Sequence, residues 1–346
     1  MPLAFRPACR PLARGGLPHP NAQAAHALLH ATTPEVLSFP ALMRRLTRDG
    51  GAIYCAAGFP GLTLDPRSET AHVRREGVEA LFDRLALAYL RRDHSVAMPN
   101  GDQVSDLAEF LRSLHLPFRG AALKSETLGP FSLALMLIDE HERALIYASE
   151  VLEALVQHVA LRARWQAAHL REYCSEVIMC LDEPMIDGLR SAFCPLSRNE
   201  ALGMIARVLH DIEGRRGLLV EGMPDWPTLM ELNLDLLVCG SPDRFPDGAD
   251  AEYIGYFLKR GGAIGWGVVS LDATSQQVPQ LVERFGRLVR HLEQHGVERD
   301  QLLQQSFITL AANPVRLSVG EAEQALHTCA QTAFAVRKHY QLERVA

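Results

Sequence analysis

The chain has 346 residues, of which 48% are hydrophobic and 22% are charged, with a formal net charge of −6. This length and apolar content suit one large α/β domain. The acidic balance and the absence of a long basic run argue against nucleic acid as the main partner. Charged residues interrupt the longest apolar stretches, which argues against a membrane-spanning helix. Seven scattered cysteines without a CxxC motif predict free thiols in a reducing, cytoplasmic setting.

The N-terminal half mixes strand and helix signals. Residues 1–11 are rich in Pro and Arg and predict an extended lead-in before a first strand near 11–14. Asn21 is expected to cap a helix over 22–31. Residues 36–39 are ambiguous between strand and other structure. Further strands are expected near 52 and 118, helices over 71–91 and 104–114, and helical insertions over 70–115 and 140–173.

The C-terminal half is more regular, because strands alternate with helices from residue 176 onward. Apolar strands begin near 176, 217, 235, 263 and 306. Such alternation predicts a parallel sheet. With the strands near 11, 52 and 118 the count reaches eight, so we expect one (β/α)₈ TIM barrel over 1–346. A doubly wound open sheet is the alternative, but no GxGxxG follows the first strand.

Polar residues at the ends of these strands are the main site candidates. Asp182 and Glu183 end one strand, and Glu221 follows the next. In a parallel barrel these positions meet at the C-terminal mouth, where carboxylates bind amines or transfer protons. The alternative is that they cap helices or pair with arginines.

Other residues near the strand ends carry weaker signals. Asp225 is expected to cap the short helix that begins near Trp226. Trp266 lies between Gly265 and Gly267, a pattern that indicates either close approach of a ligand or tight packing. His19 follows a Gly-Gly-Leu-Pro turn and faces either the mouth or solvent. Cys239 has apolar neighbours and is expected to be a buried, inert thiol.

Five segments together resemble the uroporphyrinogen decarboxylase and cobalamin-independent methionine synthase superfamily. They are GGLPH (15–19), ETLGPFSLALML (126–137), CLDEPMI (180–186), PDW (224–226) and LKRGGAIGWGVVS (258–270). The resemblance spans about residues 12 to 330 and is closer to the methionine-synthase-like side. It implies a (β/α)₈ barrel, methyl transfer to a thiol, and a substrate end that includes His19, Glu126, Asp182 and Glu183.

The resemblance also implies a zinc ion held by a His-x-Cys pair, an acid and a cysteine. Those positions fall on Leu219, Glu221, Gly240 and Ala312. Three of these residues have no side-chain donor for zinc. We therefore expect a methyltransferase-type pocket for a small thiol or methylated donor with no metal and no cofactor. Asp182, Glu183 and Glu221 would be catalytic, and Asp225, Trp226 and Trp266 would line the ligand. The alternative is a non-catalytic binding subunit with a protein partner.

Overall fold

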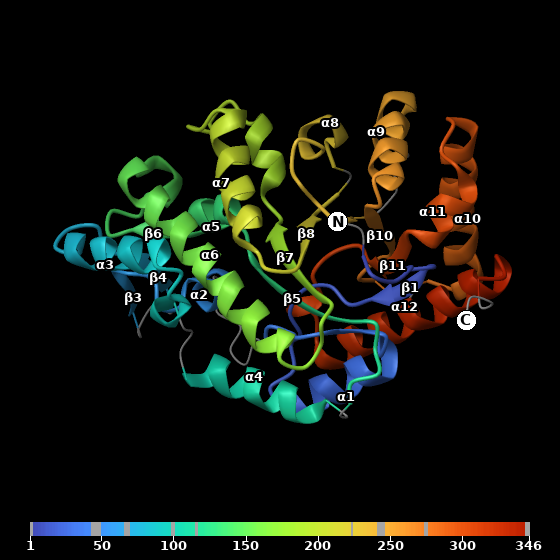
Figure 1. Ribbon diagram of the computed structural model, residues 1–346, viewed down its shortest axis with the longest axis horizontal. Helices are drawn as coiled ribbons and strands as arrows, with labels where there is room; N and C mark the ends of the chain where they lie inside the picture. Colours follow the sequence, from blue (N-terminus) through green and yellow to red (C-terminus); the bar gives the residue numbers. More distant parts are fainter. Residues whose placement is uncertain are drawn as a thin grey trace.

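The computed structural model describes residues 3–42, 50–65, 70–97, 101–114, 117–222, 224–240, 246–272 and 276–342. Its centre is a sheet of eight parallel strands in the order β1-β11-β10-β9-β8-β7-β5-β2 (Figure 1). Their bounds are β1 (Arg10–Leu12), β2 (Val36–Ser38), β5 (Ala122–Leu128), β7 (Val177–Glu183), β8 (Arg215–Val220), β9 (Leu236–Cys239), β10 (Ala263–Val269) and β11 (Ser306–Leu310).

The sheet curls into a nearly closed barrel. Its two end strands are β1 and β2, and the segments that follow them meet at a parallel bridge between Leu17 and Leu42. There the backbone nitrogen of Leu17 donates to the carbonyl of Ala41 at 2.9 Å. The expected TIM-barrel-like fold is therefore confirmed.

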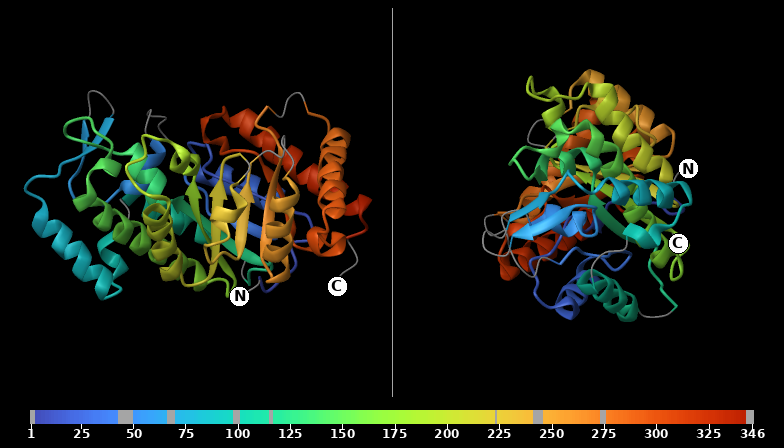
Figure 2. Two further views of the ribbon diagram at one scale, coloured as in Figure 1. Left: turned by 90° about the horizontal axis from the view of Figure 1, so that it is seen from above. Right: turned by 90° about the vertical axis from the view of Figure 1, so that its left-hand side faces the viewer.

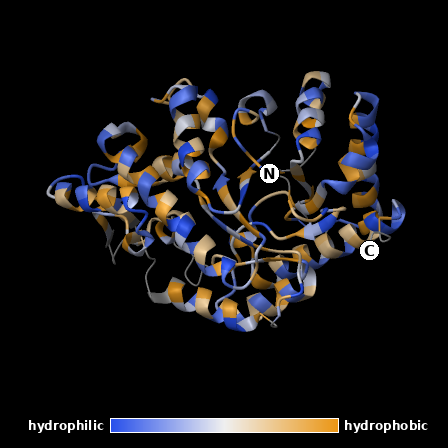
Figure 3. Cartoon of the chain, viewed as in Figure 1, coloured by the Kyte–Doolittle hydropathy of each residue, from blue (hydrophilic) through white to orange (hydrophobic). Residues whose placement is uncertain are grey.

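Helices surround the barrel and alternate hydrophilic with hydrophobic residues along their length (Figures 2 and 3). Apolar faces of this kind cover the sheet while polar faces meet water. Their bounds are α1 (Ala22–Thr32), α2 (Gly50–Ala56), α3 (Glu79–Leu90), α4 (Gly101–Ser113), α5 (Pro130–Met136), α6 (Ser149–Arg171), α7 (Arg198–Asp211), α8 (Trp226–Leu229), α9 (Gly248–Lys259), α10 (Val278–Gln294), α11 (Arg299–Gln304) and α12 (Val319–His339). No helix among these described residues is both long and apolar enough to cross a bilayer.

Two expected elements of the N-terminal half are wrong. The segment near 52 is not a strand but helix α2, and the second barrel strand is the ambiguous segment, now β2. Residues 71–78 do not begin a helix, because Thr70–Val73 form β4 of a small separate sheet. In that sheet β4 pairs antiparallel with β3 (Leu62–Asp65) and parallel with β6 (Ile138–Asp139). Pairing with the preceding strand β3 and with the distant strand β6 overrode the local helical spacing.

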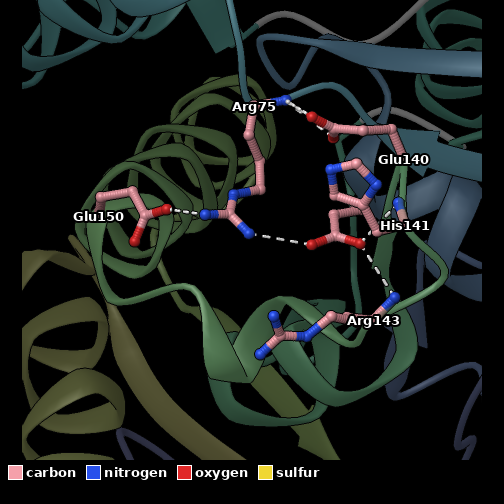
Figure 4. A network of polar contacts seen from close by, with 6 residues as sticks. Arg75, Glu140, His141, Arg143 and Glu150 are labelled. Atoms are coloured by element: carbon pink, nitrogen blue, oxygen red, sulfur yellow. Dashed lines mark hydrogen bonds and ion pairs between the residues drawn. The ribbon is translucent and has the colours of Figure 1, made fainter.

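A polar network holds this small sheet against α6 (Figure 4). Arg75 donates to Asp139 at 3.0 Å and to Glu150 on α6, and its backbone nitrogen donates to Glu140. Burial alone would raise the pKa of Asp139, but hydrogen bonds from the backbone of Arg143 and His141 and from Arg75 lower it. The ionised carboxylate therefore stabilises this corner of the fold.

Candidate active site at the barrel mouth

The barrel interior is filled by ten buried, mostly apolar side chains from alternate strand positions. They are Leu12, Val36, Ala122, Ile178, Cys180, Leu219, Leu236, Val238, Ala263 and Phe307. In a parallel sheet, residues two apart point to the same face. The inward positions toward the mouth therefore continue to Arg14, Glu126, Asp182 and Glu221, so an apolar floor lies below a charged layer.

Asp182 is the most deeply perturbed group of this layer. Its side chain is 7% exposed, and its Oδ1 has no hydrogen-bond partner within the described part of the chain. Burial raises the pKa of Asp182 to about 7, opposed by the positive charges of Arg14 and Lys124 and assisted by the carboxylates of Glu126 and Glu221. A carboxyl with this pKa exchanges a proton near neutral pH, as a general acid or base must.

Lys124 and Glu126 lie beside Asp182 on the next strand. Lys124 is fully buried, and its Nζ donates to Oε2 of Glu126 at 3.0 Å. Burial alone would lower the pKa of Lys124, but the Glu126 carboxylate outweighs it and the pKa is raised. Lys124 therefore remains positively charged, with Glu126 as its ion-pair partner.

Arg14 reaches into the mouth from the segment after β1. It is 1% exposed, and its guanidinium donates to the carbonyl of Val220 at 3.0 Å and to that of Ala311 at 3.2 Å. Arginine remains protonated in proteins. Its partners here are neutral, so the mouth contains a positive charge that no carboxylate within hydrogen-bonding distance cancels in the described residues.

Glycine backbones pack closely where β8, β9, β10 and β11 end. The nitrogen of Gly240 donates to the carbonyl of Gly222 at 2.7 Å. A Cβ on Gly240 would overlap the Gly222 backbone, and one on Gly267 would lie 2.7 Å from the Cα of Ala311. Real Cβ atoms do not approach this closely, so a side chain at Gly240 or Gly267 would require the backbone to move.

Glu183 lies on the opposite face of β7 from Asp182. Its two carboxylate oxygens accept from the backbone nitrogens of Phe131 at 3.1 Å and Ser132 at 2.7 Å, at the start of α5. Burial raises the pKa of Glu183 to about 7 despite these hydrogen bonds. The structure thus separates the two acids of the Asp-Glu-Pro segment: Asp182 faces the barrel interior and Glu183 caps a helix.

Three residues expected to line the ligand lie outside the barrel interior. Asp225 accepts from the backbone nitrogen and the hydroxyl of Thr228, which confirms it as the cap of α8, and it also borders a small rim pocket of about 60 Å³. Trp226 and Trp266 are fully buried and pack against each other with ring centroids 6.3 Å apart. Trp266 donates to Ser306 at 3.0 Å, while Gly265 and Gly267 face inward.

His19 and Glu221 remain at the mouth side of the barrel. His19 is 1% exposed, and its Nε2 lies 3.4 Å from Glu323 on α12. Glu221 is exposed directly after β8 and lies close enough to Asp182 to affect its pKa. Arg14 and Lys124 were not predicted. The sequence did contain a signal for them. Positions 12 and 14, and positions 122, 124 and 126, lie on the same face of their strands, so charged residues alternate with buried apolar ones there.

The cysteines and metal-binding side chains give no metal centre in the described residues. No group of three His, Cys, Asp or Glu side chains there is arranged to hold a metal ion. Cys239 is fully buried, and burial raises its pKa to about 12, as it does for Cys180 inside the barrel. Both thiols are therefore protonated at neutral pH and unreactive.

Comparison with known proteins gives similarity in structure but not in sequence. No protein-family profile matches the chain, and no curated protein matches its sequence. A methyltransferase from Methanosarcina mazei has a TM-score of 0.55 at 12% identity, covering 96% of this chain and 95% of that one. A B12-independent methionine synthase from Shewanella sp. W3-18-1, in complex with selenomethionine, has a TM-score of 0.47 at 14% identity, covering 68% and 67%. At 12% identity the likeness to the methyltransferase shows a shared fold alone.

Proposed function

We propose that this chain is a barrel enzyme of the methyl-transfer type that holds a small thiol or a methylated donor at its mouth. The observation that carries the proposal is Asp182, a buried carboxylate whose Oδ1 has no hydrogen-bond partner among the described residues and whose pKa is raised to about 7. Groups with such perturbed pKa values cluster at functional sites. The whole-length likeness in fold to a methyltransferase and the five sequence segments quoted above favour the same class.

In this proposal Asp182 binds the polar end of the ligand or accepts its proton, and Glu221 stands at the rim as a second acid or base. Glu126 acts with Lys124 to hold the charge balance of the mouth. Glu183 is a positioning residue, because it fixes the strand end that presents Asp182. His19, Asp225, Trp226 and Trp266 support the surrounding loops.

The proposed chemistry does not involve zinc. Leu219, Gly240 and Ala312 offer no donor at the positions that the resemblance assigns to zinc ligands. The Gly240 position also has no room for a longer side chain without a backbone shift. The residues present therefore do not fit the zinc site of the resembling family.

Calorimetric titration with small thiols and their methylated thioether products tests the function. We expect saturable binding to the wild type and at least about tenfold weaker binding to Asp182→Asn, since a charged contact is lost. Asp187→Asn is the control, because it changes an exposed carboxylate in the segment that follows β7. No binding of any thiol or thioether, or equal binding by the Asp182 variant, contradicts the proposal.

The closed glycine packing at Gly222, Gly240 and Gly267 favours a second candidate, a non-catalytic binding subunit that associates with a protein partner. Backbone atoms of these glycines occupy the place where the resemblance would put a zinc ligand. Methyl-transfer assays separate the two candidates. Binding of a thiol without its methylation by folate, corrinoid or sulfonium donors favours the second, and formation of the thioether favours the first.

A further inference from the structure

Two buried polar atoms at the mouth lack hydrogen-bond partners within the described ranges, and they are complementary. One is the acceptor Oδ1 of Asp182, and the other is the donor Nε of Arg14. The two side chains interact electrostatically, yet they form no direct ion pair. A buried donor and acceptor left unpaired cost about 1–3 kcal/mol each, so an arrangement that keeps both is suited to a ligand that pairs with both.

Arg14 lies close to the positions where the resemblance would place zinc ligands. Its guanidinium bonds to the carbonyls of Val220 and Ala311, which directly precede Glu221 and Ala312. Those are two of the positions where the resembling family has its zinc ligands. The fixed positive charge of Arg14 therefore lies between the same two strand ends.

Resting on the proposed function, we propose that Arg14 is a thiolate-binding residue: its guanidinium supplies the positive charge that a metal supplies in zinc-dependent thiol methylation, and Asp182 takes the thiol proton. A thiol has the hydrogen-bonding groups that these two atoms lack: its S–H donates to an acceptor such as Oδ1 of Asp182, and its sulfur accepts from a donor such as Nε of Arg14.

The proton transfer balances without a further reactant. The S–H bond breaks, its electron pair stays on sulfur, and the proton joins the ionised carboxylate of Asp182. The pocket begins with Arg14 positive, Asp182 negative and a neutral thiol, and it ends with Arg14 positive, a thiolate and a neutral carboxyl. The net buried charge does not change, so the step avoids the large cost of creating an isolated ion in an apolar interior.

The energetics of this step are modest. A free thiol has a pKa of about 8.5, and burial holds the pKa of Asp182 at about 7. Lys124 cannot replace Arg14, because Glu126 already neutralises it at 3.0 Å. Among the described residues, the hydrogen-bond partners of Arg14 are carbonyls, so its charge is available to stabilise the thiolate.

The test combines calorimetric titration with ultraviolet difference spectra, which detect the absorption band of a thiolate. The probes are homocysteine and homoserine, which differ only by sulfur and oxygen. For the wild type at neutral pH we expect homocysteine to bind and to show a thiolate band. Homoserine should bind without ionising. Arg14→Met and Asp182→Asn should lose the band, Arg14→Lys should retain part of it, and the exposed-arginine control Arg190→Met should retain it fully.

The outcomes separate this inference from the proposed function. Homocysteine binding to the wild type without a thiolate band overturns the role of Arg14 but leaves the thiol pocket standing. A full band in a folded Arg14→Met variant also overturns it. If the wild type binds neither thiols nor thioethers, the proposed function fails. The wild-type spectrum alone decides the matter if Arg14→Met does not fold, because a role for Arg14 requires the band to appear well below the pKa of the free thiol.

Discussion

Lys124 and Glu126 lie two residues apart on β5 and form an ion pair of 3.0 Å inside the barrel. Their side chains are 0% and 7% exposed, so neither charge is solvated by bulk water. A buried pair of this kind is weak evidence for stability in itself, but the loss of one partner leaves the other charge without compensation.

Glu126→Gln should therefore destabilise the protein by about 3–5 kcal/mol, because it leaves the Lys124 ammonium buried and unpaired. Urea denaturation measures the change. The control is Glu213→Gln, which breaks the exposed pair with Arg171 and should cost less than about 1 kcal/mol. Equal effects from the two variants would contradict the burial of Lys124. The double variant Lys124→Met with Glu126→Gln should recover part of the loss.

Asp182→Asn should make the folded protein more stable than the wild type, by an amount that grows as pH rises. The pKa of Asp182 is raised from 3.8 to about 7 on folding, so the native state binds more protons than the unfolded state in between. Its contribution to unfolding free energy is thus lost as pH increases through that window. A neutral amide avoids the loss, which amounts to as much as about 4 kcal/mol above both pKa values at about 1.36 kcal/mol per unit.

The measurement is the denaturation midpoint of the wild type and the variant from acid to mildly alkaline pH. The two curves should converge at low pH and separate toward neutrality. A constant difference at every pH would show that Asp182 ionises in the folded protein as it does in the unfolded chain.

Asp139→Asn should show the opposite dependence on pH. The carboxylate of Asp139 has a lowered pKa, so its stabilisation exists above the pKa of the unfolded chain and disappears as pH falls through the folded value. We expect a loss of about 1–3 kcal/mol at neutral pH and almost none in acid. Hydrogen exchange should localise the change to β3, β4 and β6, and an effect spread evenly over the barrel would argue against the network in Figure 4.

Gly129→Ala should be strongly destabilising. A Cβ there would overlap the carboxylate of Glu183, which the nitrogens of Phe131 and Ser132 hold in place. We expect a cost of about 1–3 kcal/mol from this overpacking. Gly203→Ala is the matched control, because its Cβ on α7 meets nothing within 4 Å and alanine favours helix by about 1 kcal/mol. Thermal denaturation compares the two, and a neutral Gly129 variant would refute the contact.

Much of the barrel could be predicted because its strands are buried on both faces and read as apolar runs. The strands from β7 to β11 and the Asn21 cap of α1 followed from local signals. Local signals left β2 ambiguous and assigned β4 to a helix, because these segments are strands through their pairing, β2 with β5 and β4 with β3 and β6. The mouth was only partly predictable. Asp182 could be identified from its place at a strand end. Arg14 and Lys124 became candidates only when the strand register showed that their side chains point into the barrel.

The contacts of Arg14 also bear on how the chain folds as it is synthesised. β1 is made first, but its parallel partner is β11, and Arg14 bonds to Ala311 beyond the end of that strand. During synthesis from the N-terminus, the edge of β1 and the side chain of Arg14 therefore lack these partners until almost three hundred further residues have been made. A ribosome-bound chain that stops before residue 306 should keep an unpaired first strand, open to premature pairing with other chains. Completion of the mouth is thus tied to the emergence of the last strand.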